Sequence, residues 1–280
     1  MIEPVPFDRV GHQVRIPVTA GHLEGRFLLD SGIGLTTVST DLARRLGLEL
    51  TRTSFTGHRM SGQEITVPLA RLPRLTVGGH VVRDGLVGVF DLGPTEGESG
   101  LDGILGLDLL GDVVVQVDPS ARLVELQPDP LLVHRYDNEV PVRVHRDGPS
   151  VALFVELRLP SGRVVDVEVD TGSRCLILDT RFMSDCGVGP DDVTETLTGT
   201  DETGHDYSRS FATVRGAVGV IGAPSADQPS PRVMFQSIVH DGLLGSDFLD
   251  RFVHGFDVRR RHLMLSALEP LRSAPGRAAS

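Results

Sequence analysis

Two short motifs in the sequence could support acid and base chemistry. Asp30-Ser31-Gly32 and Asp170-Thr171-Gly172 each follow a strand-like run. If two such turns face each other, both carboxylates cannot ionise easily, so one proton is shared and one macroscopic pKa rises. The ionised carboxylate can then deprotonate a water molecule, while the protonated one polarises a peptide carbonyl and protonates the leaving nitrogen. Asp30 and Asp170 are therefore the candidate catalytic residues.

The sequence segments that would position these motifs occur twice in the chain, as an internal repeat. Residues 27–32 align with residues 167–172 at an offset of 140, and residues 102–110 align with residues 241–249 at an offset of 139. Such a repeat means that one supersecondary unit is used twice. The sequence therefore predicts two equivalent halves, each with one Asp motif and one apolar-apolar-Gly segment.

Helix signals follow both Asp motifs. Ser39 and Asp179 are favourable N-cap residues, and the helical patterns after them end at Gly47 and Gly187. We therefore expect one short helix after the strand that follows each motif.

Hairpin signals surround the motifs in both halves. Turn residues in 21–25 and 160–163 precede the motifs, and Gly57–Gly62 and Gly199–Gly204 suit hairpin tips downstream. With abundant Val, Leu and Gly, these signals predict an all-β, mostly β fold with short helices. We expect an N-terminal lobe over 1–128, a C-terminal lobe over 129–270, a flexible tail over 271–280, and a surface loop over 222–231.

The composition excludes several kinds of function. The sequence contains no Lys, and its net charge is -11, so it lacks the clustered positive charge that nucleic acid or an anionic membrane requires. No apolar stretch approaches the roughly 18 residues of a membrane span, and a signal peptide is not recognisable, so we expect a cytoplasmic protein. Cys175 and Cys186 are too few for a disulfide framework or a Cys-based zinc site, although a bridge between them stays open. We expect no metal and no cofactor.

The motifs resemble those of aspartic peptidases of the pepsin and retropepsin type, over nearly the whole chain. The resemblance implies two β-barrel lobes with the active-site cleft between them, and a peptide or protein substrate bound in extended conformation. Ser31 and Thr171 would form a hydrogen-bonded brace between the lobes, with Gly32, Gly172 and Ser173 supporting the catalytic turns. The apolar-apolar-Gly segments would pass behind these turns: Ile104, Leu105, Gly106, and Leu243, Leu244, Gly245.

The resemblance also implies a flap that closes over the substrate. Its candidate residues are Gly57, His58, Arg59, Met60, Ser61 and Gly62, and the tip Gly199–Gly204 would be the counterpart. The chain departs from the family in two respects. Leu107 and Ser246 stand where retroviral proteases carry Arg, and the flap lacks the Tyr of pepsins. Because one chain holds both aspartates, a monomer is the simpler expectation.

A difference after the two motifs predicts unequal roles for the aspartates. Ile33 follows the first motif and Ser173 the second, and only the serine can donate a hydroxyl hydrogen bond to a carboxylate. We therefore expect Asp170 to carry the charge and Asp30 the shared proton.

Other readings have less support in the sequence. There is no His-Glu-x-x-His and no Gly-x-Ser-x-Gly, so metal hydrolases and serine hydrolases lack their motifs. Asp108 and Asp247 follow the apolar-apolar-Gly segments, where an acidic residue at a helix start favours the helix dipole. We expect them to be structural. The alternative function is a catalytically silent peptide-binding or scaffolding module, because a protein can keep its fold after losing catalytic activity.

Overall fold

The computed structural model describes residues 3–93, 100–128, 136–200 and 206–268. Strands hold 56% of the residues and helices 9%, so the predicted all-β fold class is confirmed. The α-helices of the described residues are short, namely α1 (Thr40–Leu46) and α2 (Ser246–Leu249). The 3-10 helices are η2 (Thr180–Phe182), η3 (Ser184–Cys186), η4 (Pro190–Asp192) and η5 (Pro224–Ala226).

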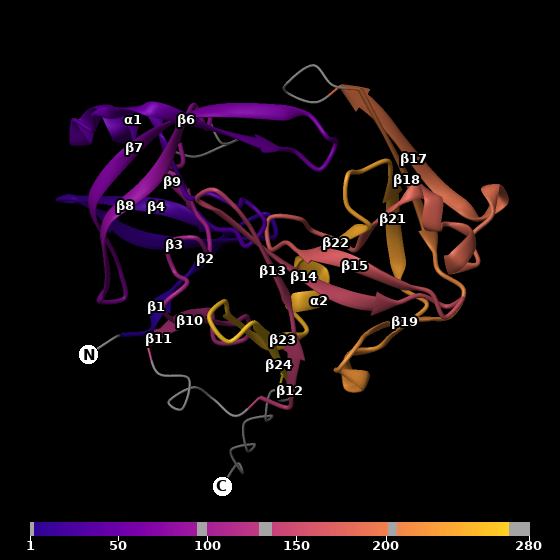
Figure 1. Cartoon of the computed structure of the whole chain (residues 1–280). Helices are drawn as coiled ribbons and strands as arrows, with labels where there is room; N and C mark the ends of the chain where they lie inside the picture. Colours follow the sequence, from indigo (N-terminus) through magenta and orange to yellow (C-terminus); the bar gives the residue numbers. More distant parts are fainter. Residues whose placement is uncertain (1–2, 94–99, 129–135, 201–205, 269–280) are drawn as a thin grey trace, which may run out of the picture.

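In the described part of the chain, the strands form three sheets (Figure 1). The N-terminal sheet has the order β2 (Asp8–Val10), β3 (Gln13–Ala20), β4 (Leu23–Leu29), β9 (Gly103–Leu105), β5 (Thr37–Ser39), β8 (His80–Phe90), β7 (Glu64–Val77), β6 (Leu50–His58). The C-terminal sheet has the order β17 (Val193–Thr200), β18 (Asp206–Thr213), β21 (Arg232–Gln236), β16 (Ile177–Asp179), β22 (Gly242–Leu244), β15 (Val164–Val169), β14 (Ser150–Arg158), β19 (Ala217–Val220), β20 (Gln228–Pro229), and β13 (Arg143–Asp147) pairs with β14.

The third sheet combines strands of both halves of the chain, at the lower centre of Figure 1. Its order is β1 (Val5–Pro6), β11 (Leu123–Gln127), β10 (Val114–Asp118), β23 (Phe252–Asp257), β24 (His262–Ala267), β12 (Asn138–Pro141). The pairing of β10 with β23 joins the two halves, and a continuous cluster of buried apolar side chains extends through both of them. The division into lobes at residues 128 and 129 stays a prediction, and residues 129–135 and the predicted tail 271–280 lie outside the described residues.

The repeat in the sequence corresponds to a repeat in strand order around each Asp motif. In the first half, β4 runs parallel to β9, and β9 is antiparallel to β5. In the second half, β15 runs parallel to β22, and β22 is antiparallel to β16. Each Asp motif therefore leaves the end of a strand that is flanked by its own apolar-apolar-Gly segment.

The predicted helix caps are present in both halves, but only the first one opens an α-helix. The Ser39 hydroxyl accepts a hydrogen bond from the Leu42 N–H at 3.0 Å, and α1 ends at Gly47 with φ 64°. Asp179 accepts from the Arg181 N–H at 2.9 Å, yet the following residues form η2 and η3 before Gly187. The helix of the first half is rich in Leu, Ala and Arg, whereas the second has Thr, Ser, Asp and Cys, which favour the α-helix less.

Most of the predicted hairpins are present. The turns before the motifs lie at residues 21–22 and 159–163, and the tip between β6 and β7 lies at residues 59–63. The tip between β17 and β18, residues 201–205 with Gly204, is outside the described residues. The predicted loop over 222–231 is wrong in part, because it contains η5 and β20, whose Pro229 occupies an edge strand where no donor is needed.

Among the described residues, no helix has the length and apolar character to cross a membrane. Both cysteines are free thiols, with Cys186 buried and Cys175 half-buried. The Arg259-Arg260-Arg261 run is exposed between β23 and β24.

Candidate active site

The two apolar-apolar-Gly segments hold the Asp turns by equivalent backbone hydrogen bonds. The Asp30 N–H donates to the carbonyl of Leu105 at 3.0 Å, and the Asp170 N–H donates to the carbonyl of Leu244 at 3.1 Å. The glycines that open these segments allow the close contact, since a Cβ on Gly103 would collide with the Phe27 ring. Each Asp is therefore fixed at the end of its strand by a neighbouring strand of the same sheet.

The carboxyl groups of Asp30 and Asp170 lie close enough for the charge of Asp170 to raise the pKa of Asp30. The motif glycines make this approach possible. A Cβ on Gly32 would lie less than 3.0 Å from the carboxyl group of Asp170, and one on Gly172 would lie equally close to that of Asp30. The structure thus brings together the two residues that the sequence proposed as a pair, and each glycine leaves room for the opposite carboxylate.

Behind the two carboxyl groups, Ser31 and Thr171 form a reciprocal set of hydrogen bonds. The Ser31 N–H donates to Thr171 Oγ1 at 2.9 Å, and the Thr171 N–H donates to Ser31 Oγ at 3.0 Å. Each hydroxyl then donates to the other half, Ser31 to the carbonyl of Val169 at 2.7 Å and Thr171 to that of Leu29 at 3.2 Å. Both side chains are buried, so water does not compete for these bonds.

The two carboxyl groups accept different numbers of hydrogen bonds. Asp30 accepts from the N–H group of Gly32 at 2.8 Å. Asp170 accepts from the N–H groups of Gly172 and Ser173 at 2.9 and 3.2 Å, and also from the Ser173 hydroxyl at 2.6 Å. Asp170 therefore accepts more hydrogen bonds than Asp30, and one of them comes from a hydroxyl group.

Burial is the main influence on the protonation of Asp30. It raises the pKa of Asp30 to about 8, together with the charge of Asp170, while the hydrogen bond from the N–H of Gly32 acts in the opposite direction. The direction of this shift favours the protonated form of Asp30. This direction supports the unequal roles that Ile33 and Ser173 suggested.

The pair lies in a cleft of about 590 Å³. One side, which we call the apolar wall, comes from the N-terminal sheet and consists of Leu35, Phe55, Ile65, Val67, Phe90 and Ile104. The other side, which we call the mixed wall, comes from the second half and consists of His145, Asp147, Ser150, Ala152, Phe154, Glu168, His240 and Leu243. The cleft thus offers two different surfaces beside one pair of carboxyl groups.

The predicted flap is the hairpin tip between β6 and β7, which extends toward the second half (Figure 1). Its residues Gly57, His58, Arg59 and Met60 line the cleft, whereas Ser61 and Gly62 do not. The carbonyl of Met60 accepts a hydrogen bond from the N–H of Val239 at 2.9 Å, and the Met60 side chain packs on the cluster around Ile238. The tip therefore bridges from one half to the other over the cleft.

Two residues near the pair were not foreseen from the sequence. His12 donates from Nε2 to the carbonyl of Gly172 at 2.8 Å, so the first half also supports the second Asp turn. Glu168 is a further carboxyl group in the cleft, whose lining also includes Asp147. It lies two positions before Asp170, near the end of β15, where successive side chains alternate between the two faces of the sheet. The alternation of side chains between the two faces of β15 was the sequence signal that could have identified Glu168.

Asp108 differs from its predicted place at a helix start. No helix of the described residues begins there, and Asp108 instead accepts hydrogen bonds from the N–H and hydroxyl of Thr36 at 3.0 and 2.6 Å. The Thr36 hydroxyl in turn accepts from the Gly106 N–H at 3.0 Å. Asp108 thus ties the segment after Asp30 to the apolar-apolar-Gly segment. Its counterpart Asp247 does lie in the first turn of α2, as predicted.

Replacing Asp108 by Asn should change how the stability of the protein depends on pH. Burial raises the pKa of Asp108 to about 6, against the hydrogen bonds from Thr36. A raised carboxyl pKa gives stability that is present below pH 3.8 and is lost as pH rises through 6. Relative to the wild type, Asp108→Asn should therefore gain about 1–2 kcal/mol between pH 4 and 7, measured by urea unfolding. An unfolding difference that is constant with pH would contradict this assignment.

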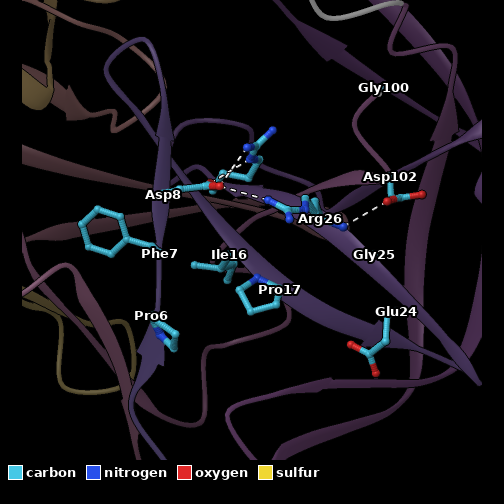
Figure 2. A pocket seen from close by; sticks show the side chains of 11 residues that line it. Pro6, Phe7, Asp8, Ile16, Pro17, Glu24, Gly25, Arg26, Gly100 and Asp102 are labelled. Atoms are coloured by element: carbon cyan, nitrogen blue, oxygen red, sulfur yellow. Dashed lines mark hydrogen bonds and ion pairs between the residues drawn. The ribbon is translucent and has the colours of Figure 1, made fainter. Parts of the chain in front are cut away.

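A second cavity, of about 650 Å³, lies away from the pair (Figure 2). Its charged side chains neutralise one another. Arg15 donates to Asp8 at 2.7 and 2.8 Å, and Arg26 donates to the same carboxylate at 3.0 Å (Figure 2). Asp102 in turn accepts from the backbone N–H of Arg26. These charges therefore have partners in the protein itself, and Glu24, which also lines the cavity, accepts a hydrogen bond from the Thr19 hydroxyl at 2.8 Å.

Comparison with known families agrees with this geometry. Residues 14–109 match the family model described as aspartyl protease, a range that extends from β3 through the first apolar-apolar-Gly segment and includes Asp30. No curated protein matches the chain. The matched range holds the first copy of the repeat, and the second copy has the same strand order around Asp170. Residues 14–109 are therefore similar to aspartyl proteases, and they include the first of the two Asp motifs.

Proposed function

We propose that the protein is an aspartic endopeptidase that hydrolyses peptide bonds with a water molecule activated by Asp30 and Asp170. One observation carries the proposal: two carboxyl groups from equivalent turns, each packed against the glycine of the opposite motif, lie together in a cleft large enough for a peptide segment. A pair with one proton supplies a base and an acid at the same point, which is what amide hydrolysis requires.

The unequal surroundings of the two carboxyl groups support different roles for Asp30 and Asp170. Asp170, with its additional hydroxyl donor, deprotonates the water as that water attacks the peptide carbonyl. Asp30, which keeps its proton at neutral pH, polarises the carbonyl oxygen and then protonates the leaving nitrogen. Asp170 ends with the proton from water and Asp30 ends ionised, so transfer of one proton between the two carboxyl groups restores the starting state.

The substrate would be an extended peptide held between the pair and the hairpin tip of β6 and β7. The apolar wall suits an apolar side chain on one side of the scissile bond. Since one chain supplies both carboxylates, we propose that a monomer is sufficient, with lobes over 1–128 and 129–270 and the cleft between them. A cytoplasmic location stays a prediction from the sequence.

Hydrolysis of an unbiased peptide library tests the proposal directly. The purified protein and its Asp30→Ala variant would be incubated with the library between pH 4 and 8, and the products identified by mass spectrometry. Cleavage by the wild type that is absent in the variant is the expected result. If the wild type cleaves nothing at any pH but still binds peptides, the protein is a silent peptide-binding module instead.

A further inference from the structure

Glu168 belongs to a row of residues that crosses the mixed wall. In the strand register, Phe154 on β14 faces Glu168 on β15, which in turn faces Leu243 on β22. Residues directly opposite in a sheet point to the same face. All three line the cleft, so the carboxyl group of Glu168 is part of the surface that contacts a bound peptide.

The first half of the chain has an apolar residue at the equivalent position. Glu168 corresponds to Leu28 at the offset of 140, and Leu28 faces Ile104 just as Glu168 faces Leu243. Both positions are more than nine-tenths buried, since Leu28 is 4% exposed and Glu168 is 8% exposed. A buried leucine is therefore compatible with this strand arrangement, so we infer that the carboxyl group of the second copy is not needed for folding.

The surroundings of Glu168 leave its charge poorly compensated. Its ion-pair partner is His240, with Oε2 and Nε2 3.6 Å apart. Burial and then the cation Arg143 lower the pKa of His240, so the imidazole is neutral at neutral pH. Burial, Asp170 and Asp30 all raise the pKa of Glu168 well above its usual value. Arg143 itself is engaged by Asp166 at 2.9 Å and stacks on Phe154.

We propose that Glu168 is a specificity-determining residue that selects peptides with a lysine or arginine side chain next to the scissile bond. The inference rests on the proposed function in that it takes an extended peptide as the occupant of the cleft. When such a peptide displaces water from the mixed wall, an apolar side chain leaves the carboxyl group without a donor, and an acidic one adds a like charge.

A basic side chain supplies a hydrogen-bond donor to Glu168 and brings an opposite charge instead of a like one. An ammonium or guanidinium group donates a charge-assisted hydrogen bond to Glu168, which then ionises. The shared negative charge of Asp30 and Asp170 lies close enough to act on Glu168 and adds to the attraction. The apolar wall would then bind an apolar side chain of the substrate, and the mixed wall would bind a basic one.

Binding of uncleavable peptides tests the inference without requiring turnover. Two peptides would be compared whose central amide is replaced by a hydroxyethylene group, one with lysine and one with norleucine, placed in turn at each flanking position. At one of these positions the wild type should bind the lysine peptide about 10- to 100-fold more tightly. Glu168→Gln should reduce the ratio to near one, and Glu168→Leu, which restores the residue of the first copy, should favour norleucine.

The matched control is Glu156→Gln, the same chemical change at an exposed position of the neighbouring strand β14. It should keep the wild-type ratio. Equal binding of the two peptides by the wild type at both positions would overturn the inference, as would an unchanged ratio in Glu168→Gln. Cleavage of the corresponding amide peptides reports on the proposed function separately: cleavage without preference overturns only the role of Glu168, and preference without cleavage overturns only the peptidase activity.

Discussion

Asp30→Asn and Asp170→Asn should each lower kcat/KM for peptide hydrolysis at neutral pH by at least about a thousandfold. Asn in place of Asp30 can still donate a hydrogen bond to a carbonyl, but it has no proton to give to the leaving nitrogen. Asn in place of Asp170 cannot accept the proton of the attacking water. Circular dichroism should show both variants folded, because Asn has nearly the shape of Asp.

The pH dependence of the wild type should report the raised pKa of Asp30. Activity requires Asp30 protonated and Asp170 ionised, so kcat/KM should stay high at neutral pH and fall as pH rises through about 8. Burial and the charge of Asp170 are the causes, and both act on the free protein. Initial rates between pH 4 and 9 at low substrate concentration provide the measurement.

The unequal roles of the pair can be separated by the residual rates of the two variants. In Asp170→Asn the like charge is gone, so the pKa of Asp30 should fall relative to the wild type, although burial still raises it. In Asp30→Asn the Ser173 hydroxyl still donates to the ionised Asp170 at 2.6 Å. Plots of residual kcat/KM against pH should therefore differ in shape between Asp30→Asn and Asp170→Asn. Identical profiles at every pH, or a wild-type decline already near pH 5, would contradict the assignment.

The sequence was most informative where local chemistry was repeated. Ser39 and Gly47 delimit α1 because capping depends on residues within one turn of the helix. The two Asp motifs could be paired because each was followed by the same series of elements, and no single motif carried that information. The fold class and the pair of candidate aspartates could therefore be predicted from the sequence alone.

The contacts that the sequence did not reveal join residues distant in the chain. His12 reaches Gly172 across 160 residues, and Thr36 reaches Asp108 across 72. Glu168 was one acidic residue in a strand pattern until the register placed it opposite Phe154 and Leu243. Such contacts depend on register and on the packing of the two halves, and neither follows from propensity or periodicity.

The reciprocal hydrogen bonds of Ser31 and Thr171 lead to the second large effect. Thr171→Ala removes the acceptor of the buried Ser31 N–H and the donor to the Leu29 carbonyl. An unsatisfied buried polar group costs about 1–3 kcal/mol, so the variant should lose about 2–5 kcal/mol of unfolding free energy. Urea unfolding at constant pH, followed by circular dichroism, measures this loss.

Thr171→Ser is the matched control, because serine is the residue of the first copy and keeps the hydroxyl group. It removes one buried methyl group and should cost only about 1 kcal/mol. The alanine variant should also lose kcat in its folded fraction, since Asp30 and Asp170 are held together by the turns that the two hydroxyls connect, whereas the serine variant should keep most of it. If alanine and serine destabilised the protein equally, the methyl group rather than the hydrogen bonds would be what Thr171 contributes, and the pair of carboxyl groups would be held by other contacts, with His12 at Gly172 as the first to examine.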